Sequence, residues 1–585
     1  MKLLDAHRII NAPPDPARPT RRYELICGFT PLSLEVYFQA HVRERSPSAN
    51  VCVETGRFGD IAGNLERARL RAPDGAAVII EWADVDARLS IRGHGAVAAA
   101  GAAADLLASA SASLQRLSDR IAALAADTRV SVCLPTLPLP PYFADPPFVA
   151  GTTRLRLDAL IANFAADLAT VEHVRIVDRA RLAESSPVDE RWDAAGELTT
   201  GFPYTREHSD ATGFALANAL LPPAPKKGLI TDLDDTLWRG ILGEVGTGGV
   251  TWALESGSHV HSLYQQCLAN LAEAGVLIAV ASKNDAAIVA DALRREDFVF
   301  PTSRFFPIQA TWSPKSAAVT AILNTWNVGP DSVVFVDDSP MELAEVQHVH
   351  PDVECLRFDP KSPAAVVALL QRLGDLFGRD RIRAEDRLRI ESLRNASEYH
   401  ETVKLAADPD AFLASVMPVV EVAVEGAATD ERALELVNKT NQFNLNGRRF
   451  GTSDWNAALA DPEAFLVVFS YRDKFGPLGR IGVVLGTRRN GEASVRSWVL
   501  SCRAFARRVE HVMLETLFEK LETDVVTLDV ARTGRNGPLL EFLAPYGELP
   551  ATSGTLRITR ADFARTRPVL AHSIVMKDHS GNGRD

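Results

Sequence analysis

Short apolar runs and longer amphipathic stretches alternate along the first 220 residues of the chain. The apolar runs predict β-strands at residues 23–28, 50–54, 77–82, 129–134 and 174–177. Apolar residues with helical spacing lie between them, at 32–43, 96–126 and 155–170. Because strands that alternate with helices usually form a parallel sheet, this region has the pattern of an α/β domain.

Two seams divide the chain into three blocks. The first is the proline-rich segment 222–225, which predicts an extended linker. The second is 379–401, whose helical spacing carries many charges and little apolar face, as in a solvated connecting helix. We therefore expect three domains, at 1–222, 226–378 and 402–572. The polar residues 573–585 are predicted to be a disordered tail.

The composition narrows the class of protein. The chain has 585 residues, and its 46% hydrophobic content is enough for folded cores. The formal net charge of −12 argues against nucleic-acid binding, because nucleic-acid binders usually carry a basic field. The sequence predicts neither a secretory signal nor a membrane-spanning segment. For that reason we expect a soluble, cytoplasmic protein. Its six cysteines lack the CxxC spacing of zinc sites, and their scattered positions fit a reducing compartment.

Carboxylates follow an apolar run at the start of the middle block. In the segment LITDLDDTL, Asp232 and Asp234 lie two residues apart, so both project toward one side at the end of a strand. Ligands of open α/β sheets bind at that edge. Two further predicted strands end at Ser282 and Asp337, and Lys315 lies between them in the sequence. A lone Asp-x-Asp pair is often only a solvent-facing cap, but the ordered set predicts a site.

The residue types in this set suit phosphoryl transfer. Neighbouring carboxylates repel each other unless a cation lies between them, and Mg²⁺ prefers oxygen ligands beside a phosphate. A lysine and a hydroxyl can hold the transferring phosphoryl group. The alternatives without a catalytic role are that Ser282 caps a helix and that Lys315 is a surface charge.

The four segments that contain Asp232, Ser282, Lys315 and Asp337 resemble the four motifs of the haloacid dehalogenase (HAD) phosphatase superfamily. The resemblance implies that Asp232 is the nucleophile and that Asp234 is the general acid/base. It implies that the phosphoryl group is bound by Ser282, Lys283 and Lys315. It also implies a Mg²⁺ site built from Asp232, Asp337 and the main-chain carbonyl of Asp234, with supporting roles for Thr236, Asn284 and Asp338. The interval from Thr236 to Ser282 and the interval from Ser282 to Lys315 are both too short for a cap domain. We therefore expect a capless site that is open to bulky substrates.

The residues around the motifs are most similar to one branch of that superfamily. The segments DLDDTLWRGILGE, AVASKND and FVDDSP resemble the FkbH-like branch, HAD subfamily IIIC. The resemblance implies an enzyme that loads a D-glyceryl unit from 1,3-bisphosphoglycerate onto an acyl carrier protein and removes phosphate, in polyketide or related biosynthesis. It also implies a degenerate SGNH-like α/β domain before the HAD-like domain, a GNAT-like α+β domain after it, and a phosphopantetheine arm as the acceptor.

The third block supports this expectation. After the segment KTNQFNL, we predict strands at 465–471, 481–486 and 497–501 and then a helix from Ala504. This order of elements is similar to that of a GNAT-type acyltransferase. Both glycines of the GNAT pyrophosphate loop are replaced, by Ala506 and Arg508, which disfavours close approach of a pyrophosphate. Contacts to the pantetheine arm and the carrier are instead expected from a basic patch that comprises Arg448, Arg449, Arg503, Arg507 and Arg508.

Cys502 is the cysteine with the clearest candidate role. It precedes Arg503 and the predicted helix, and both features lower the pKa of a thiol. We hypothesise that its thiolate takes the glyceryl group from the acyl phosphate before the carrier thiol does. The alternative is a small buried residue that fills a turn.

The first block shows no complete catalytic pattern. An SGNH hydrolase needs a Gly-Asp-Ser turn, whereas the first strand here ends in Cys-Gly-Phe-Thr, and we expect His208 to lie in a loop. A docking or structural role is therefore expected for this domain. For the whole chain two other functions stay open: a stand-alone Mg²⁺-dependent phosphatase of a small phosphate ester, and a non-catalytic factor that docks carrier proteins.

Overall fold

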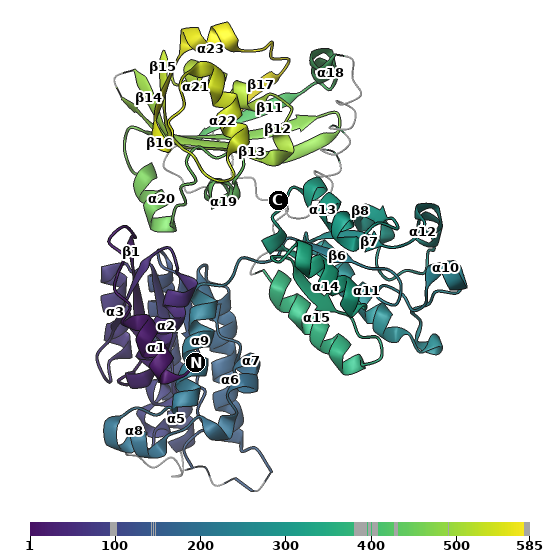
Figure 1. Cartoon of the computed structure of the whole chain (residues 1–585). Coiled ribbons are helices and arrows are strands. Elements are labelled where there is room, and N and C mark those ends of the chain that lie inside the picture. Colours follow the sequence, from purple (N-terminus) through teal and green to yellow (C-terminus); the bar gives the residue numbers. More distant parts are fainter. Residues whose placement is uncertain are drawn as a thin grey trace. The chain divides into compact units, whose positions relative to one another are not determined.

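The chain folds into two compact units, which divide between Ala224 and Pro225. Figure 1 labels the helices and strands of the chain and colours them along the sequence, from purple at the N-terminus to yellow at the C-terminus. The computed structural model describes residues 1–93, 102–379, 408–425, 431–489 and 491–577, except for 142, 144 and 147, together with Asn395 and Tyr399. The first unit carries one sheet, and the second carries two. The expected linker helix at 379–401 lies almost wholly outside the described residues and stays a prediction.

The first unit is a parallel five-stranded sheet with the order β2-β1-β3-β4-β5. Its strands are β1 (Thr20–Ile26), β2 (Asn50–Thr55), β3 (Gly75–Ile79), β4 (Val130–Cys133) and β5 (Val174–Ile176). Alternate residues of β3 point to opposite faces, so Ala77 and Ile79 join one core while Ala76 and Val78 join the other. The parallel α/β pattern predicted for this block is confirmed.

Helices cover both faces of this sheet. One face packs against α2 (Leu32–Arg45) and α9 (Arg206–Leu220). The other packs against α3 (Ile61–Arg71), α5 (Ala102–Ala125) and α6 (Thr152–Ala169). Four shorter helices complete the unit: α1 (Leu3–Ile10), α4 (Trp82–Val85), α7 (Arg179–Ser185) and α8 (Ala194–Thr200).

His208 lies in the first turn of α9 and is fully buried, so its expected place in a loop is wrong. Its ring nitrogens lie 2.8 Å from Oγ1 of Thr136 and 2.9 Å from Oγ of Ser186. The Thr136 hydroxyl also donates to Glu81 at 2.6 Å. Burial lowers the pKa of His208 to about 3, so the ring is neutral at physiological pH. The four side chains form a buried network that fits a structural role.

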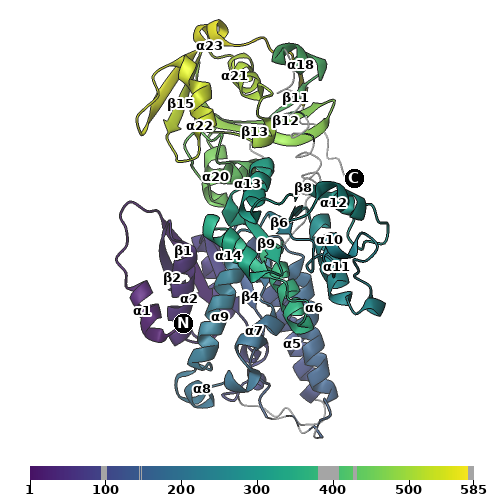
Figure 2. The same cartoon turned by 45° about the vertical axis from the view of Figure 1, so that its right-hand side comes forward.

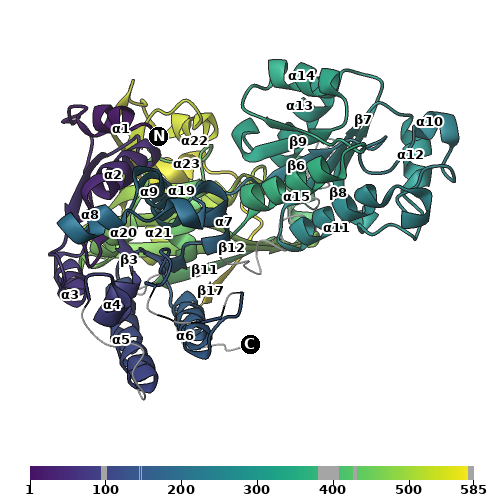
Figure 3. The same ribbon diagram turned by 90° about the horizontal axis from the view of Figure 1, so that it is seen from below.

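The middle sheet is also parallel and five-stranded, with the order β10-β9-β6-β7-β8. Its strands are β6 (Gly228–Thr231), β7 (Leu277–Ser282), β8 (Phe305–Ala310), β9 (Val333–Asp337) and β10 (Glu354–Arg357). One face packs against α11 (His259–Glu273) and α15 (Pro363–Phe377), and the other against α13 (Lys315–Trp326) and α14 (Pro340–Val349) (Figure 3). Only short helices, such as α10 (Leu242–Val245) and α12 (Ala286–Ala292), lie among the described loops at its edge.

The third sheet is mixed and seven-stranded, with the order β16-β15-β14-β13-β12-β11-β17. Its strands are β11 (Val419–Glu425), β12 (Ala464–Asp473), β13 (Gly476–Arg489), β14 (Glu492–Leu500), β15 (Val525–Ala531), β16 (Ser553–Thr559) and β17 (Ser573–Lys577). Neighbouring strands are antiparallel except for the pairs β14–β15 and β11–β17. This is the α+β pattern expected for the third block.

Helices lie on both faces of the third sheet as well, and Figure 2 shows α21 and α20 on opposite sides of β13. The helices are α18 (Pro409–Ser415), α19 (Glu431–Lys439), α20 (Thr452–Leu459), α21 (Val509–Lys520), α22 (Gly537–Leu543) and α23 (Arg560–Thr566). The predicted disordered tail is wrong for its first five residues, because Ser573–Lys577 pairs with β11 as β17. Among the described residues, no helix is both long enough and apolar enough to cross a membrane.

Candidate active site

The residues of the HAD-like motifs lie at the carboxyl edge of the middle sheet. The backbone N–H of Asp232 donates to the carbonyl of Val336 at 3.0 Å, which continues the pairing of β6 with β9. β9 ends at Asp337, and β7 ends at Ser282. Because these three strands are parallel neighbours, their last residues come together at one edge.

Lys315 is the first residue of α13 and is only 2% exposed. Its Nζ lies 2.8 Å from Oδ1 of Asp232, 2.5 Å from Oδ2 of Asp337 and 2.6 Å from Oε2 of Glu342. Burial by itself would lower the pKa of Lys315, but the three carboxylates outweigh it and the pKa is raised. Lys315 is therefore charged and partly neutralises a buried acidic cluster.

Asp232 and Asp337 are buried beside each other at this edge. Burial raises the pKa of both carboxyl groups, Lys315 opposes the rise, and the charge of Asp337 adds to it for Asp232. The charged forms are therefore costly even beside the lysine. A divalent cation would relieve this cost.

The donor set of the site fits Mg²⁺. Asp232, Asp337 and Glu342 each place a carboxylate oxygen within 4.8 Å of the others. Oxygen donors with negative charge are the ligands that Mg²⁺ prefers. The side chain of Asp234 does not belong to this group of three, and the expected contribution of its main-chain carbonyl stays a prediction.

The carboxylate of Asp234 is held by three hydrogen bonds. Its Oδ1 accepts from Nε1 of Trp238 at 2.9 Å and from the N–H of Leu242 at 3.1 Å. Its Oδ2 accepts from Nδ2 of Asn284 at 2.9 Å, and the same amide group donates to Oγ of Ser282 at 3.0 Å. Asn284 thus connects the residue expected to act as acid/base with a residue expected to bind phosphate.

The turn after β6 is tied to the end of β9. Oγ1 of Thr236 donates to Oδ1 of Asp338 at 3.5 Å, and burial raises the pKa of Asp338. Asp235, the third carboxylate of the motif, has a left-handed φ of 50° and accepts from the N–H of Gly240 at 2.8 Å. Its carboxylate is therefore used in shaping the turn.

Glu342 is a site residue that the sequence analysis missed. It lies in the first turn of α14, and its Oε1 is 2.9 Å from Nζ of Lys283 while Oε2 contacts Lys315. An acidic residue in the first turn of a helix is common, because it complements the helix dipole. Asp338 lies four positions before Glu342 but precedes α14, so no helical spacing links the two and no local pattern pointed to Glu342.

The predicted lowering of the pKa of Cys502 is wrong. Cys502 begins a short 3₁₀ turn, and α21 begins only at Val509, so the thiol does not lie at the start of that helix. The helix cannot begin at Ala504, because Ala506 and Arg508 have left-handed φ values of 61° and 54°. Burial raises the pKa of the Cys502 thiol, although the neighbouring Arg503 acts in the opposite direction.

The contact predicted for Arg507 is also wrong, because this side chain is fully buried. Its Nε lies 3.1 Å from Oδ2 of Asp473, and its guanidinium lies 3.8 Å from the centre of the Tyr399 ring. A buried arginine that pairs with a buried aspartate and stacks on an aromatic ring is part of the core. It cannot contact a carrier protein at the surface.

The other arginines of the expected patch are partly or fully exposed. Arg508 pairs with Asp410, and Nε of Arg503 donates to Oγ of Ser501 at 3.2 Å. Arg448 lies 4.8 Å from the centre of the Phe450 ring, while Arg449 donates to the main-chain carbonyls of Val437 and Thr440. Carrier binding by these four arginines stays a prediction.

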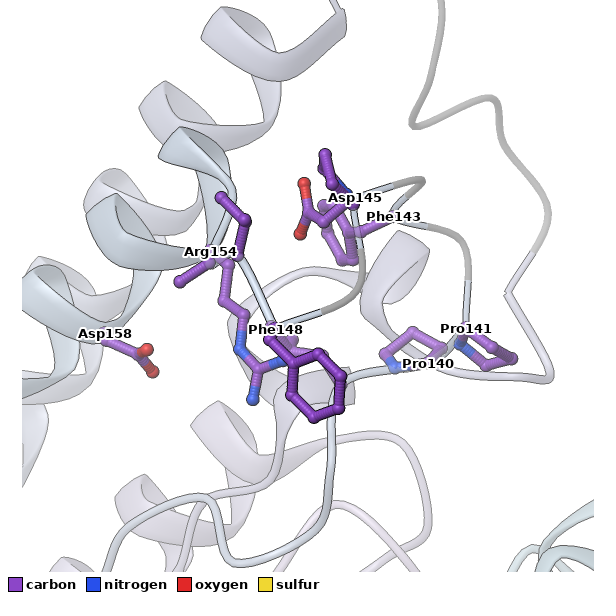
Figure 4. A pocket seen from close by; sticks show the side chains of 11 residues that line it. Pro140, Pro141, Phe143, Asp145, Phe148, Arg154 and Asp158 are labelled. Carbon is purple, nitrogen blue, oxygen red and sulfur yellow. The ribbon is translucent and has the colours of Figure 1, made fainter.

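A cavity of about 640 Å³ opens in the first unit, beside the loop after β4 (Figure 4). The exposed ring of Phe148 and the side chain of Arg154 line it, together with several prolines. None of the residues predicted from the motifs belongs to its lining. The cavity is therefore separate from the acidic cluster on the middle sheet.

Comparisons with protein-family models and with curated proteins give no match. Among solved structures, the chain is similar to the N-terminal part of BF1531 from Bacteroides fragilis, which contains a phosphatase domain and was crystallised with Mg. That match has 18% identity and a TM-score of 0.48, and covers 65% of this chain and 100% of the other. A second match, to S. aureus MnaA with UDP, has 8% identity and a TM-score of 0.13, and covers 66% of this chain and 99% of the other.

Proposed function

We propose that the chain is a Mg²⁺-dependent phosphatase of the HAD type with Asp232 as its nucleophile. The observation that carries this proposal is the buried cluster in which Lys315 contacts Asp232, Asp337 and Glu342 at the carboxyl edge of a parallel sheet. Phosphoryl transfer depends on positioning and on neutralising the charge of the phosphoryl oxygens. A lysine and an oxygen-lined cation site beside a buried carboxylate offer both.

The chemistry then runs in two steps. A carboxylate oxygen of Asp232 attacks phosphorus, the bond to the leaving oxygen breaks, and Asp234 gives that oxygen a proton. Water next attacks the phosphorus of the aspartyl phosphate, and Asp234 takes a proton from the water. The bond from phosphorus to the Asp232 oxygen breaks, which frees inorganic phosphate and regenerates the carboxylate. Bound Mg²⁺ would supply positive charge near the phosphoryl oxygens. The hydrogen bonds from Trp238 and Asn284 hold Asp234 in one orientation for both proton transfers.

We further propose that the substrate is a phosphoglyceryl group carried on an acyl carrier protein. A thiol attacks C1 of 1,3-bisphosphoglycerate, the bond from C1 to the phosphate oxygen breaks, and phosphate leaves. The resulting thioester then loses its C3 phosphate at Asp232. The residues of the motifs support this substrate. The described segments after β6 and β7 support it too, because α11 packs on the sheet while α10 and α12 are short. The arm of a carrier protein needs an open site.

A narrower function, hydrolysis of a small phosphate ester, is the second candidate. The raised pKa of Cys502 favours it, because a protonated thiol is a weak nucleophile toward an acyl phosphate. In that case the acidic cluster acts alone and no thioester forms.

One experiment separates these functions. A candidate carrier protein is incubated with 1,3-bisphosphoglycerate, Mg²⁺ and the protein, and its intact mass is measured. A glyceryl increment supports loading, and the Asp232→Asn variant is then expected to leave phosphoglyceryl on the carrier. Phosphate release from small esters without any increment would support the narrower phosphatase. No increment and no phosphate release would reject both functions.

A further inference from the structure

Glu342 contacts two different lysines with its two carboxylate oxygens. Oε1 lies 2.9 Å from Nζ of Lys283, and Oε2 lies 2.6 Å from Nζ of Lys315. Lys283 follows β7 and Lys315 begins α13, while Glu342 belongs to α14. One side chain therefore joins three separate elements at the edge of the sheet.

The contacts of Lys315 show why such a bridge matters. An ammonium group has three hydrogens, and three carboxylates lie within 2.8 Å of this nitrogen. In the proposed reaction Asp232 must turn its oxygen toward phosphorus, and Asp337 belongs to the cation site. Glu342 can keep its contact with Lys315 while the other hydrogens turn to phosphoryl oxygens.

The start of α14 is fixed against the start of α13. One turn beyond Glu342, Oε1 of Glu345 accepts from the N–H of Ser316 at 3.0 Å and from its hydroxyl at 2.7 Å. Because Ser316 follows Lys315 directly, α14 holds both the backbone and the side chain at this point. The two helices therefore fix where the ammonium group lies.

The exposure of the two lysines differs in a useful way. Lys315 is 2% exposed, whereas Lys283 is 38% exposed and the carboxylate between them is 20% exposed. A long exposed lysine side chain ordinarily samples many rotamers, and ordering it is costly. The contact with Glu342 holds Lys283 close to the buried lysine before any ligand arrives.

We propose that Glu342 is a positioning residue that holds Lys283 and Lys315 side by side as a two-lysine clamp for a phosphate dianion. This inference rests on the proposed phosphatase function and deepens it, because it states how the site recognises its phosphoryl group. The competing role for Glu342 is that of a cation ligand, since its carboxylate also lies near Asp232 and Asp337.

The test compares Glu342→Gln with Lys283→Met and with the double variant. The matched control is Glu273→Gln, which removes an exposed carboxylate that pairs with Arg304 in the same domain. For each protein, steady-state rates with a phosphate ester are measured at saturating Mg²⁺, and the binding of inorganic phosphate is measured by calorimetry. The Mg²⁺ concentration for half-maximal activity is measured as well.

We expect Glu342→Gln to raise KM and to weaken phosphate binding by about tenfold, since charged hydrogen bonds to the lysines are lost. The Mg²⁺ requirement should change less than the phosphate affinity, because Asp232 and Asp337 stay as oxygen donors for the cation. The control variant should behave as wild type. The double variant should be little worse than Glu342→Gln, because both changes disable the same clamp. The KM and phosphate affinity of Glu342→Asp should lie between those of wild type and Glu342→Gln, because the shorter side chain can reach fewer partners. This variant replaces Glu342→Gln in the test if the glutamine variant folds poorly.

Three results would overturn the inference. The first is a higher Mg²⁺ requirement of Glu342→Gln without weaker phosphate binding. The second is an unchanged KM and phosphate affinity in both Glu342 variants. The third is that the effects of the two single changes add up in the double variant. Failure of the proposed function looks different, because wild-type protein would then release no phosphate from any ester. Calorimetry with inorganic phosphate tests the clamp in that case too.

Discussion

Lys315 is almost fully buried, yet three carboxylates lie within hydrogen-bonding distance of its ammonium group. Charges out of water are tolerated only when they are paired. Asp232 and Asp337 need Lys315 for their own burial, and the raised pKa of both shows that the compensation is incomplete. Stability and the proposed chemistry therefore depend on the same residues.

This dependence predicts the effect of Lys315→Met on stability. The change leaves Asp232 and Asp337 buried without a positively charged partner, and we expect it to cost about 3 kcal/mol of unfolding free energy near pH 8. A carboxyl group whose pKa is raised on folding stabilises the folded state at low pH and loses this effect as the pH rises. The cost should therefore be smaller near pH 5. Denaturant melts at both pH values check this.

Two additions sharpen that measurement. Mg²⁺ should restore part of the lost stability of the variant, since a cation can replace the missing positive charge. The exposed Lys361 offers the control, and Lys361→Met should leave the melting curve unchanged. Equal stability of Lys315→Met and wild type at pH 8 would contradict the electrostatic account.

The thiols offer a second prediction at this scale. Burial raises the pKa of Cys502, whereas Cys52 is exposed. Each unit by which a thiol pKa rises above the pH lowers its thiolate fraction about tenfold. We expect iodoacetamide at pH 7.5 to label Cys52 well before Cys502, with Cys502 gaining at higher pH. Peptide mass spectrometry measures the order in which the two thiols are labelled. Labelling of Cys502 before Cys52 would support the hypothesis that Cys502 is a reactive thiol.

At the scale of elements, the loop before α21 has a left-handed backbone at two positions that do not carry glycine. The two positions where glycine is expected in a GNAT loop carry Ala506 and Arg508, and both are left-handed. Side chains with a Cβ atom adopt this region at a cost of roughly 1 kcal/mol. The backbone conformation therefore survives without glycine.

Ala506→Gly should relieve this strain. We expect the substitution to raise the melting temperature of the second unit slightly, by the equivalent of up to about 1 kcal/mol. The control is Ala504→Gly, a buried position without a left-handed φ, where added chain entropy should lower stability. Differential scanning calorimetry compares the two. A loss of stability in both variants would show that the alanine side chain matters more than the strain.

At the scale of the whole molecule, the chain divides between Ala224 and Pro225, and the acidic cluster lies entirely in the second unit. The first unit has its own sheet and its own cores on both faces. No residue of the cluster comes from it. Chemistry on a small phosphate ester should therefore not need the first unit.

A fragment of residues 225–585 tests this division. We expect it to release phosphate from a small ester with a kcat within about twofold of the full chain at the same Mg²⁺ concentration, since it keeps every residue that contacts the cluster. Asp232→Asn in the same fragment provides the inactive control. A large loss of kcat in a fragment that melts cooperatively would mean that the first unit contributes to the site.

The sequence by itself determined the five strands of the first sheet and the placement of Asp232, Ser282 and Asp337 at strand ends in the second. It did not predict α3 and α9 of the first block or β8 and β10 of the middle block. Periodicity and turn residues act over a few positions, and parallel strands bring their ends to one edge whatever the loops between them do. These are local properties of the chain.

Only the tertiary structure decided which side chains meet and which are buried. Glu342 reaches two lysines from a helix on another part of the chain, and Arg507 is enclosed by Asp473 and Tyr399. The pKa of Cys502 is set by burial, which outweighs the charge of its neighbour in sequence. Burial and side-chain contacts depend on residues far apart in the sequence, so no local pattern could indicate them.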